Sequence, residues 1–164
     1  MTQLNLHIRD ARLPEERPQL CEFILGSQRF EHAFEPNRRL DPPVGAEYFA
    51  VLEEEVRSKG GKMLVAARDG EPLLGWAVVH FLEDDVFVSA GERKYAYLSE
   101  LYVAESERGK GVGRALIEAC EDWARGQGLH VMQIGVLPDN RRAATIYEQA
   151  GFAPYGVRLR KYLP

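Results

Sequence analysis

A cluster of glycine and basic residues between positions 108 and 114 is the clearest chemical signal in the sequence. Its members are Arg108, Gly109, Lys110, Gly111, Val112, Gly113 and Arg114. Glycine lets a backbone approach a ligand closely, and the first N–H groups of a helix have no partner within it. An apolar helical repeat begins at Val112. The cluster therefore predicts a cradle for phosphate, which fits a diphosphate that carries adenosine and a long arm.

Two other phosphate-binding patterns do not match this cluster. A P-loop requires Ser or Thr after Gly-Lys, whereas Gly111 follows Lys110. The dinucleotide pattern requires a third glycine at position 116, which is Leu116. A glycine-rich turn also serves as a simple tight connection, so the turn alone leaves its ligand open.

The cluster resembles the pyrophosphate-binding motif of the GCN5-related N-acetyltransferase (GNAT) family. That motif is Gln or Arg, two residues, Gly, one residue, and then Gly or Ala, and residues 108–113 satisfy it. Residues 140–152 look like the family's second cofactor motif, and they follow a strand pattern at 130–136. Because both motifs occur in order, the resemblance implies an enzyme that uses acetyl-CoA and no metal.

The resemblance also implies contacts with the pantetheine arm of the cofactor. Backbone groups of Leu101 and Val103 are expected to bind this arm, with one N–H polarising the thioester carbonyl. Asn140 is placed to cap a helix, and the resemblance adds a hydrogen bond toward the arm. The two roles of Asn140 are compatible, and the cap alone remains an alternative.

Tyr147 is the predicted general acid. It lies on the apolar face of the helical pattern 140–150, where an aromatic residue ordinarily belongs to the core. The resemblance instead places this tyrosine at the cofactor sulfur. A phenol with a pKa of about 10 can protonate a thiolate as it leaves.

Glu100 is the candidate general base, because an acidic residue on this strand often has that role in the family. The attacking amine must be neutral, while an amine of lysine-like pKa is almost wholly protonated at pH 7. Strand alternation places Glu100 on the face opposite Tyr97, Ser99, Leu101 and Val103, and a bulge would shift that register. A structural or substrate-orienting carboxylate is the alternative.

The acceptor is expected to be a primary amine of a small molecule or a protein. An acidic loop at 83–85, with Phe30, Phe34 and Tyr48, is a candidate lining for a cationic acceptor. A solvated loop and a core-facing helix are the competing interpretation of these residues. The sequence does not choose the acceptor.

Apolar spacing outlines the elements that position these residues. Strand patterns occupy residues 4–8, 63–67, 73–82, 95–103 and 130–136. Helical patterns run through residues 20–24, 45–56, 112–123 and 140–150. The first helix is expected to end near Gly26, and residues 27–43 to form a loop or broken helix.

The resemblance completes this outline as an α/β fold. The length of 164 residues predicts a single domain over residues 1–164, and the resemblance implies a mixed, mostly antiparallel sheet of six or seven strands with about four flanking helices. The cofactor is expected where the strands that begin at Tyr95 and His130 splay apart. Final strands through residues 157–163 are expected to offer an edge for a homodimer.

Bulk composition excludes several classes of protein. The formal net charge of −4 disfavours a sequence-independent nucleic-acid binder. No apolar run approaches the roughly 20 residues of a membrane span, so a cytoplasmic protein is expected. Cys21 and Cys120 lie in apolar patterns without metal-ligand spacing, which predicts buried free thiols.

The predicted function is direct transfer of the acetyl group of acetyl-CoA to an amine. The first alternative is a non-catalytic regulatory module that binds acyl-CoA, against which the presence of Tyr147 argues. The second is a general nucleotide-binding domain, which would prefer ATP or NAD to coenzyme A.

Overall fold

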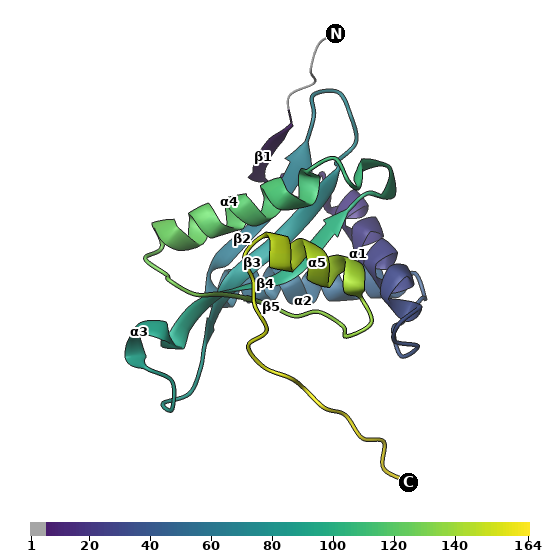
Figure 1. Cartoon of the computed structure of the whole chain (residues 1–164). Helices are drawn as coiled ribbons and strands as arrows, with labels where there is room; N and C mark the ends of the chain where they lie inside the picture. The colour runs from purple at the N-terminus through teal and green to yellow at the C-terminus, as the bar shows by residue number, and fades with distance from the viewer. Residues whose placement is uncertain (1–5) are drawn as a thin grey trace.

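A five-stranded sheet forms the centre of the molecule (Figure 1). The computed structural model describes residues 6–164. The strands are β1 (His7–Asp10), β2 (Gly61–Ala67), β3 (Gly75–Glu83), β4 (Lys94–Val103) and β5 (Met132–Ile134). They follow chain order across the sheet, antiparallel from β1 to β4, with β5 parallel to β4. The mixed, mostly antiparallel sheet is confirmed, but the prediction of six or seven strands is wrong.

Helices cover both faces of the sheet (Figure 1). One face carries α1 (Arg17–His32) and α2 (Pro43–Lys59), and the other carries α4 (Val112–Gly126) and α5 (Arg141–Gln149). A four-residue helix, α3 (Ala90–Arg93), lies in the loop between β3 and β4. The described chain thus has the four predicted principal helices and this short addition.

Strand alternation divides the core into two apolar layers, because neighbouring side chains of a strand point to opposite faces. Val79 and Leu98 pack with Leu116 beneath α4. On the other face Trp76 packs with Phe49 of α2, and their stacked rings lie 6.2 Å apart. Burial of both layers against helices fixes the sheet between them.

A β-bulge interrupts β4 at Ser99. Val79 pairs with Leu98 and Val78 pairs with Glu100, so Ser99 has no partner residue on β3. The Ser99 hydroxyl donates a hydrogen bond to the Val78 carbonyl at 3.3 Å. An extra residue of this kind changes which face the following side chains occupy.

The bulge places Glu100 on the side of α1 and α2, together with Tyr97. Tyr97 pairs with His80 of β3, and the centroids of their rings lie 5.8 Å apart. His80 Nε2 in turn lies 3.3 Å from a carboxylate oxygen of Glu55 on α2. Leu101 packs on the opposite, α4 side. Strict alternation put Glu100 opposite Tyr97, and that part of the prediction is wrong because of the bulge.

The first helix continues through Gly26, where the sequence predicted its end. A Cβ atom at Gly26 would lie 2.4 Å from the Tyr102 hydroxyl oxygen of β4. The glycine therefore permits close packing of α1 on the sheet instead of stopping the helix. Residues 27–32 are helical, contrary to prediction, while residues 33–42 form the expected irregular connection.

Other local predictions agree with the structure. The second helix ends at Gly60, and the Asp69-Gly70 turn joins antiparallel β2 and β3 with Gly70 at a φ of 77°. Of the strand predicted at residues 130–136, only the three residues of β5 form a strand. The pattern 4–8 overlaps β1, although residues 1–5 lie outside the described chain.

The C-terminal strands expected at 157–163 are absent. The structure assigns no helix or strand after Gln149, and residues 153–164 run as an extended chain. A strand requires a neighbour for its N–H and C=O groups, and this segment has none in the described molecule. This accounts for the smaller number of strands.

Candidate active site

The glycine cluster forms an open turn between β4 and α4. Gly109 and Gly111 have φ values of 76° and 85°, which glycine adopts readily and other residues rarely do. A Cβ atom at either position would meet no atom of the described residues within 4 Å. The outer side of the turn is therefore free to receive a ligand.

The N-terminus of α4 presents backbone donors beside this turn. Gly111 is its N-cap, no side chain caps it, and the Ala115 N–H bonds to the Gly111 carbonyl at 3.0 Å. The N–H groups of Val112, Gly113 and Arg114 precede that bond and have no partner within the helix. With the positive end of the helix dipole, they suit a diphosphate.

The Arg108 side chain contacts β4 and α1 behind the turn. Its Nε donates to the Val103 carbonyl at 3.1 Å. Its guanidinium lies 5.3 Å from the Phe30 ring centroid and 5.5 Å from that of Tyr102. Cation–π contacts of this kind hold the guanidinium between α1 and β4. Binding of phosphate by Arg108 stays a prediction.

The other basic side chains of the turn are paired with carboxylates. Lys110 Nζ lies 3.1 Å from Glu107 Oε1, and Arg114 Nε lies 2.8 Å from Glu118 Oε1. Hydrogen bonds from Lys110 and then Arg68 hold the pKa of Glu107 below its ordinary value. Such exposed pairs are weak, so a phosphate can compete for Lys110 and Arg114.

Beside the turn, β4 and β5 separate. The two strands pair only at Ala96–Met132, Tyr97–Gln133 and Leu98–Ile134. Beyond Leu98, β4 continues to Val103 with no described strand on that side. Leu101 and Val103 lie on this unpaired part, as the predicted pantetheine contacts require, although the contacts themselves stay a prediction.

Tyr147 is half-buried on α5. Its ring contacts Phe152 edge-on at 6.0 Å and packs on the apolar layer beneath α4. Burial, followed by the charges of Glu100 and Glu31, raises the pKa of Tyr147 to about 12. The phenol thus remains protonated at neutral pH, as a proton donor must, and it lies within electrostatic range of both carboxylates.

Glu100 is half-buried on β4. Burial and, to a smaller extent, the negative charge of Glu31 raise its pKa to about 8, although a hydrogen bond with Tyr48 acts in the opposite direction. A pKa near the working pH suits a group that must both take and release a proton. The charge of Glu100 also acts on Tyr147, so the two candidates, which the sequence predicted separately, lie within electrostatic range of each other.

Glu31 and Tyr48 complete this polar group from α1 and α2. Burial and the charge of Glu100 raise the pKa of Tyr48 above its ordinary value. The carboxylate of Glu31 is bound by Arg38 Nε at 2.8 Å. The sequence analysis does not identify Glu31, because it lies in residues 27–43, for which a loop or broken helix is predicted; its helical spacing from the residues of α1 is the one signal that indicates it.

The remaining candidates for the acceptor site differ in position. Phe30 of α1 lies 5.3 Å from the Arg108 guanidinium, and its ring is 5.4 Å from that of Phe34, which follows α1. Residues 83–85 lie at the other end of the β3–β4 hairpin, where Glu83 pairs with Lys94. Of the suggested set, Tyr48 alone contacts Glu100.

Asn140 caps α5, as predicted. Its Oδ1 accepts a hydrogen bond from the Ala143 N–H at 3.2 Å, and the residue is buried. Its cofactor role stays a prediction. Gly151 follows the helix with a φ of 94°, as expected of a left-handed stop.

Groups of metal ligands and membrane-crossing helices are both lacking in the described part of the chain. In residues 6–164 no three His, Cys, Asp or Glu side chains are grouped as metal ligands require. None of the helices described has the length and apolar character that crossing a membrane demands. Cys21 is half-buried and Cys120 buried, and both are free.

Comparison with known sequences identifies the class of protein that this fold and turn define. The sequence model of the acetyltransferase (GNAT) family matches residues 27–152. The match covers most of the chain, and the chain belongs to this family.

Individual relatives share shorter segments. The uncharacterized N-acetyltransferase YhfO of Bacillus subtilis is 29% identical over 108 residues, 66% of this chain and 68% of that protein. The uncharacterized N-acetyltransferase YobR of the same organism is 38% identical over 60 residues, 37% of this chain and 24% of that one. Mycothiol acetyltransferase of Beutenbergia cavernae is 32% identical over 106 residues, which are 59% of this chain and 35% of that protein. The chain therefore spans only about a quarter to a third of the last two relatives.

Solved structures share the fold. A tetramutant of the BH1408 protein from Bacillus halodurans has a TM-score of 0.78 at 20% identity, covering 96% of this chain and 99% of that one. The aminoglycoside N-acetyltransferase AAC(6')-Iy, in complex with CoA, has a TM-score of 0.66 at 21% identity, and the match covers 98% of this chain and 95% of that one.

Proposed function

We propose that the chain is a single N-acetyltransferase domain that transfers the acetyl group of acetyl-CoA directly to a primary amine of a small molecule or a protein. The observation that carries this proposal is the open glycine turn and uncapped α4 N-terminus beside the separation of β4 and β5. Membership of the acetyltransferase family supports acetyl transfer. The fold neighbour in complex with CoA supports the choice of cosubstrate.

The residues of the turn fit a diphosphate. The N–H groups of Val112, Gly113 and Arg114 donate to it, and Gly109 and Gly111 leave the space that it needs. The unpaired edge of β4, together with Asn140, is proposed to bind the pantetheine arm. When bound, acetyl-CoA supplies an acetyl thioester whose leaving group is a thiolate.

Glu100 and Tyr147 are proposed to move the two protons of the reaction. The Glu100 carboxylate takes the proton that the acceptor nitrogen loses as its bond to the acetyl carbon forms. The Tyr147 hydroxyl gives a proton to the sulfur as the thioester bond breaks. Because the pKa of Glu100 is about 8, its carboxyl group can ionise near neutral pH and accept a proton. Because the pKa of Tyr147 is about 12, its hydroxyl keeps the proton that it is to donate.

The acceptor is proposed to bind as a cation on the side of α1 and α2. The charges of Glu31 and Glu100 both act on the Tyr147 hydroxyl. A protonated amine would be attracted there. The proposal includes neither nucleic acid nor membrane as a partner.

The first experiment is calorimetric titration of the wild type and two valine variants with acetyl-CoA. Gly111→Val fills the cradle, while Gly70→Val introduces the same residue at a positive φ and in equally open space on the β2–β3 turn. We expect at least a tenfold loss of affinity in Gly111→Val alone. Absence of binding by folded wild type, or equal binding by both variants, would refute the assigned cofactor site.

Thiol release with a panel of amines then tests catalysis. The panel contains a polyamine, an aminoglycoside, an amino acid and a lysine peptide, each with and without enzyme. Release with at least one of them is expected. Tight binding of acetyl-CoA without release by any amine would favour the alternative, a regulatory module that binds acyl-CoA.

A further inference from the structure

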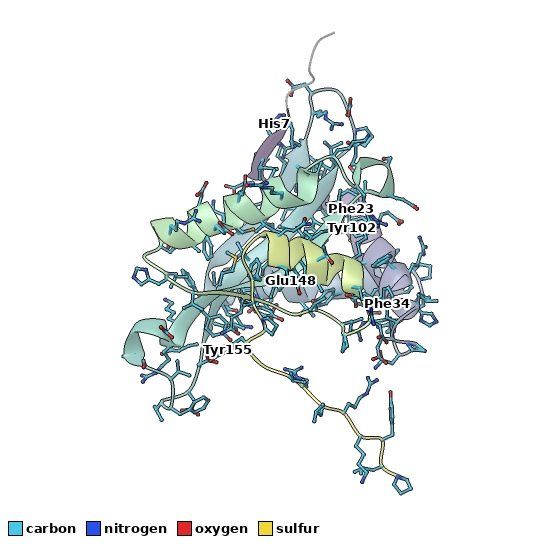
Figure 2. The ribbon with its side chains drawn as sticks, in the orientation of Figure 1. His7, Phe23, Phe34, Tyr102, Glu148 and Tyr155 are labelled. Carbon is cyan, nitrogen blue, oxygen red and sulfur yellow. The ribbon has the colours of Figure 1, made fainter. Side chains whose placement is uncertain are left out.

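The face of the sheet that α1 and α2 cover changes from apolar to polar along β4. At one end Tyr102 packs against Phe23 of α1, with ring centroids 5.2 Å apart (Figure 2). Toward the other end the side chains on this face are Glu100 and then Tyr97, which pairs with His80 of β3. The polar end therefore holds a histidine that the proposed reaction does not use.

The His80 ring is enclosed, and one of its nitrogens lacks a hydrogen bond. The side chain is only 2% exposed. Nδ1 lies 3.1 Å from the Phe81 carbonyl oxygen, and because a carbonyl only accepts, Nδ1 carries the proton of the neutral ring. Nε2 forms no hydrogen bond with any described residue, although Glu55 Oε2 lies 3.3 Å away. Buried polar atoms without a partner are rare, and this one requires an explanation.

The contact between His80 Nε2 and Glu55 Oε2 has room for one proton. In the neutral ring Nε2 presents a lone pair, and a lone pair that faces a carboxylate oxygen is unfavourable. A proton on either atom makes a hydrogen bond possible, between imidazolium and carboxylate or between imidazole and carboxylic acid. His80 and Glu55 can therefore take up and release one proton as a pair.

Glu55 extends from this interior position to the surface. Its Oε2 faces His80, while its Oε1 accepts a hydrogen bond from Lys59 Nζ at 2.8 Å. The Glu55 side chain is 28% exposed and the Lys59 side chain 39%. A proton that reaches the pair can thus leave through Glu55 to water.

The pair lies close to Glu100. Val78 pairs with Glu100, and His80 is the next residue of β3 on the same face, so His80 and Glu100 are diagonal neighbours, whose Cα atoms are typically about 7–8 Å apart. Tyr48 forms a hydrogen bond with Glu100, and the charges of Glu100 and Glu55 both act on it. Tyr48 and Glu55 are seven residues apart and share one face of α2. Tyr48 is therefore the group that connects Glu100 with the pair.

We propose that His80 and Glu55 receive, through Tyr48, the proton that Glu100 takes from the acceptor, and that they pass it to solvent. The inference rests on the proposed function, in which Glu100 is the base. Both residues act through Glu100 and are positioning residues in that sense.

The protons balance at each step of this relay. The acceptor nitrogen gives its proton to the Glu100 carboxylate. Glu100 then gives a proton to the Tyr48 oxygen as the Tyr48 hydroxyl gives its own to the pair, so Tyr48 stays neutral. Glu55 releases one proton to water. One proton enters and one leaves, and Glu100 returns to the carboxylate.

Two features of Glu100 call for such a route. Burial and the charge of Glu31 raise its pKa to about 8, so it holds a proton more firmly than an exposed carboxyl group does. The acceptor is proposed to bind on the same side, where it limits the contact of Glu100 with water. A second exit along α2 lets Glu100 ionise again for the next turnover.

The test compares the first turnover with the steady state. The assay is thiol release with acetyl-CoA and the most active amine of the panel, after rapid mixing and then over many turnovers. The first thiol release requires only that Glu100 take a proton, whereas repeated release requires that the proton leave. We expect His80→Gln and Glu55→Gln to keep the first-turnover rate within about twofold and to lower kcat about tenfold.

Glutamine suits both positions because it fills a similar volume and forms hydrogen bonds but does not exchange a proton at neutral pH. Glu54→Gln is the control, since this neighbouring carboxylate of α2 is bound by Arg57 and should leave both rates unchanged. If His80→Gln does not fold, Glu55→Gln, at a partly exposed position, decides. In deuterium oxide the kcat of Glu55→Gln should fall more than the wild-type kcat, because proton departure limits the variant.

Three outcomes overturn the relay. Unchanged kcat in folded Glu55→Gln shows that no proton leaves through the pair. An equal loss of the first-turnover rate and kcat shows that the pair only supports the structure. Absence of thiol release by the wild type with every amine refutes the proposed transfer itself, and the relay with it.

Discussion

Replacement of Glu100 by glutamine should stabilise the fold, and the gain should grow with pH. In the folded protein the pKa of Glu100 is about 8, against an ordinary value of 4.5. The folded state therefore retains a proton that the unfolded state loses between these values. Stability of the wild type is complete below pH 4.5, falls as pH rises, and levels off above pH 8. Glutamine carries no charge and escapes this fall.

The size of the effect follows from the two pKa values. The difference of about 3.5 units, at 1.36 kcal/mol per unit, sets an upper limit of about 5 kcal/mol. Structural relaxation and water entry reduce the penalty of a buried charge. We therefore expect Glu100→Gln to gain about 2 kcal/mol over the wild type between pH 5 and pH 8.

Urea unfolding at pH 5, 6, 7 and 8 measures this gain directly. The quantity to plot is the free energy of unfolding of Glu100→Gln minus that of the wild type. Glu92→Gln, which replaces an exposed carboxylate on α3, is the control and should give a flat line. A flat line for Glu100→Gln as well would show that the Glu100 carboxyl is not destabilised by burial.

Four further outcomes are expected. If Glu100 is the base, the ratio of wild-type to Glu100→Gln kcat/KM should rise about tenfold per pH unit up to pH 8; a constant ratio contradicts that role. Tyr147→Phe should lower turnover at least tenfold while calorimetric acetyl-CoA affinity stays within twofold; unchanged turnover at every pH removes it from the mechanism. Asn140→Ala should cost about 1 kcal/mol in urea unfolding, because the Oδ1 cap is lost. Gly61→Ala should cost about 1–3 kcal/mol, because its Cβ would lie 2.3 Å from the Val79 carbonyl oxygen, whereas Gly91→Ala, in open space, should be neutral.

The phosphate turn could be predicted from sequence because local chemistry determines it. The left-handed conformations of Gly109 and Gly111 and the cap of Asn140 depend on a few neighbouring residues. The same holds for the turn at Gly70. Local signals of this kind are visible in the spacing of glycine, asparagine and apolar residues.

Features that depend on distant partners could not be predicted in this way. Gly26 indicates a helix end by its type, but its role is decided by Tyr102, which is remote in sequence. The charge of Glu31 matters only because folding brings α1 close to Glu100. The final segment has the alternation of a strand, yet no strand of the described chain pairs with it.

The bulge at Ser99 links the two halves of the candidate site. If Ser99 occupied a regular place in the ladder, alternation from Leu98 would turn Glu100 toward α4 and Leu101 toward α1 and α2. With Ser99 inserted, Leu98 and Leu101 both remain in the layer beneath α4, while Glu100 faces Tyr48. The last pair between β4 and β5 is Leu98–Ile134, immediately before the bulge. A single irregularity thus directs the carboxyl to the acceptor side at the point where β4 and β5 separate.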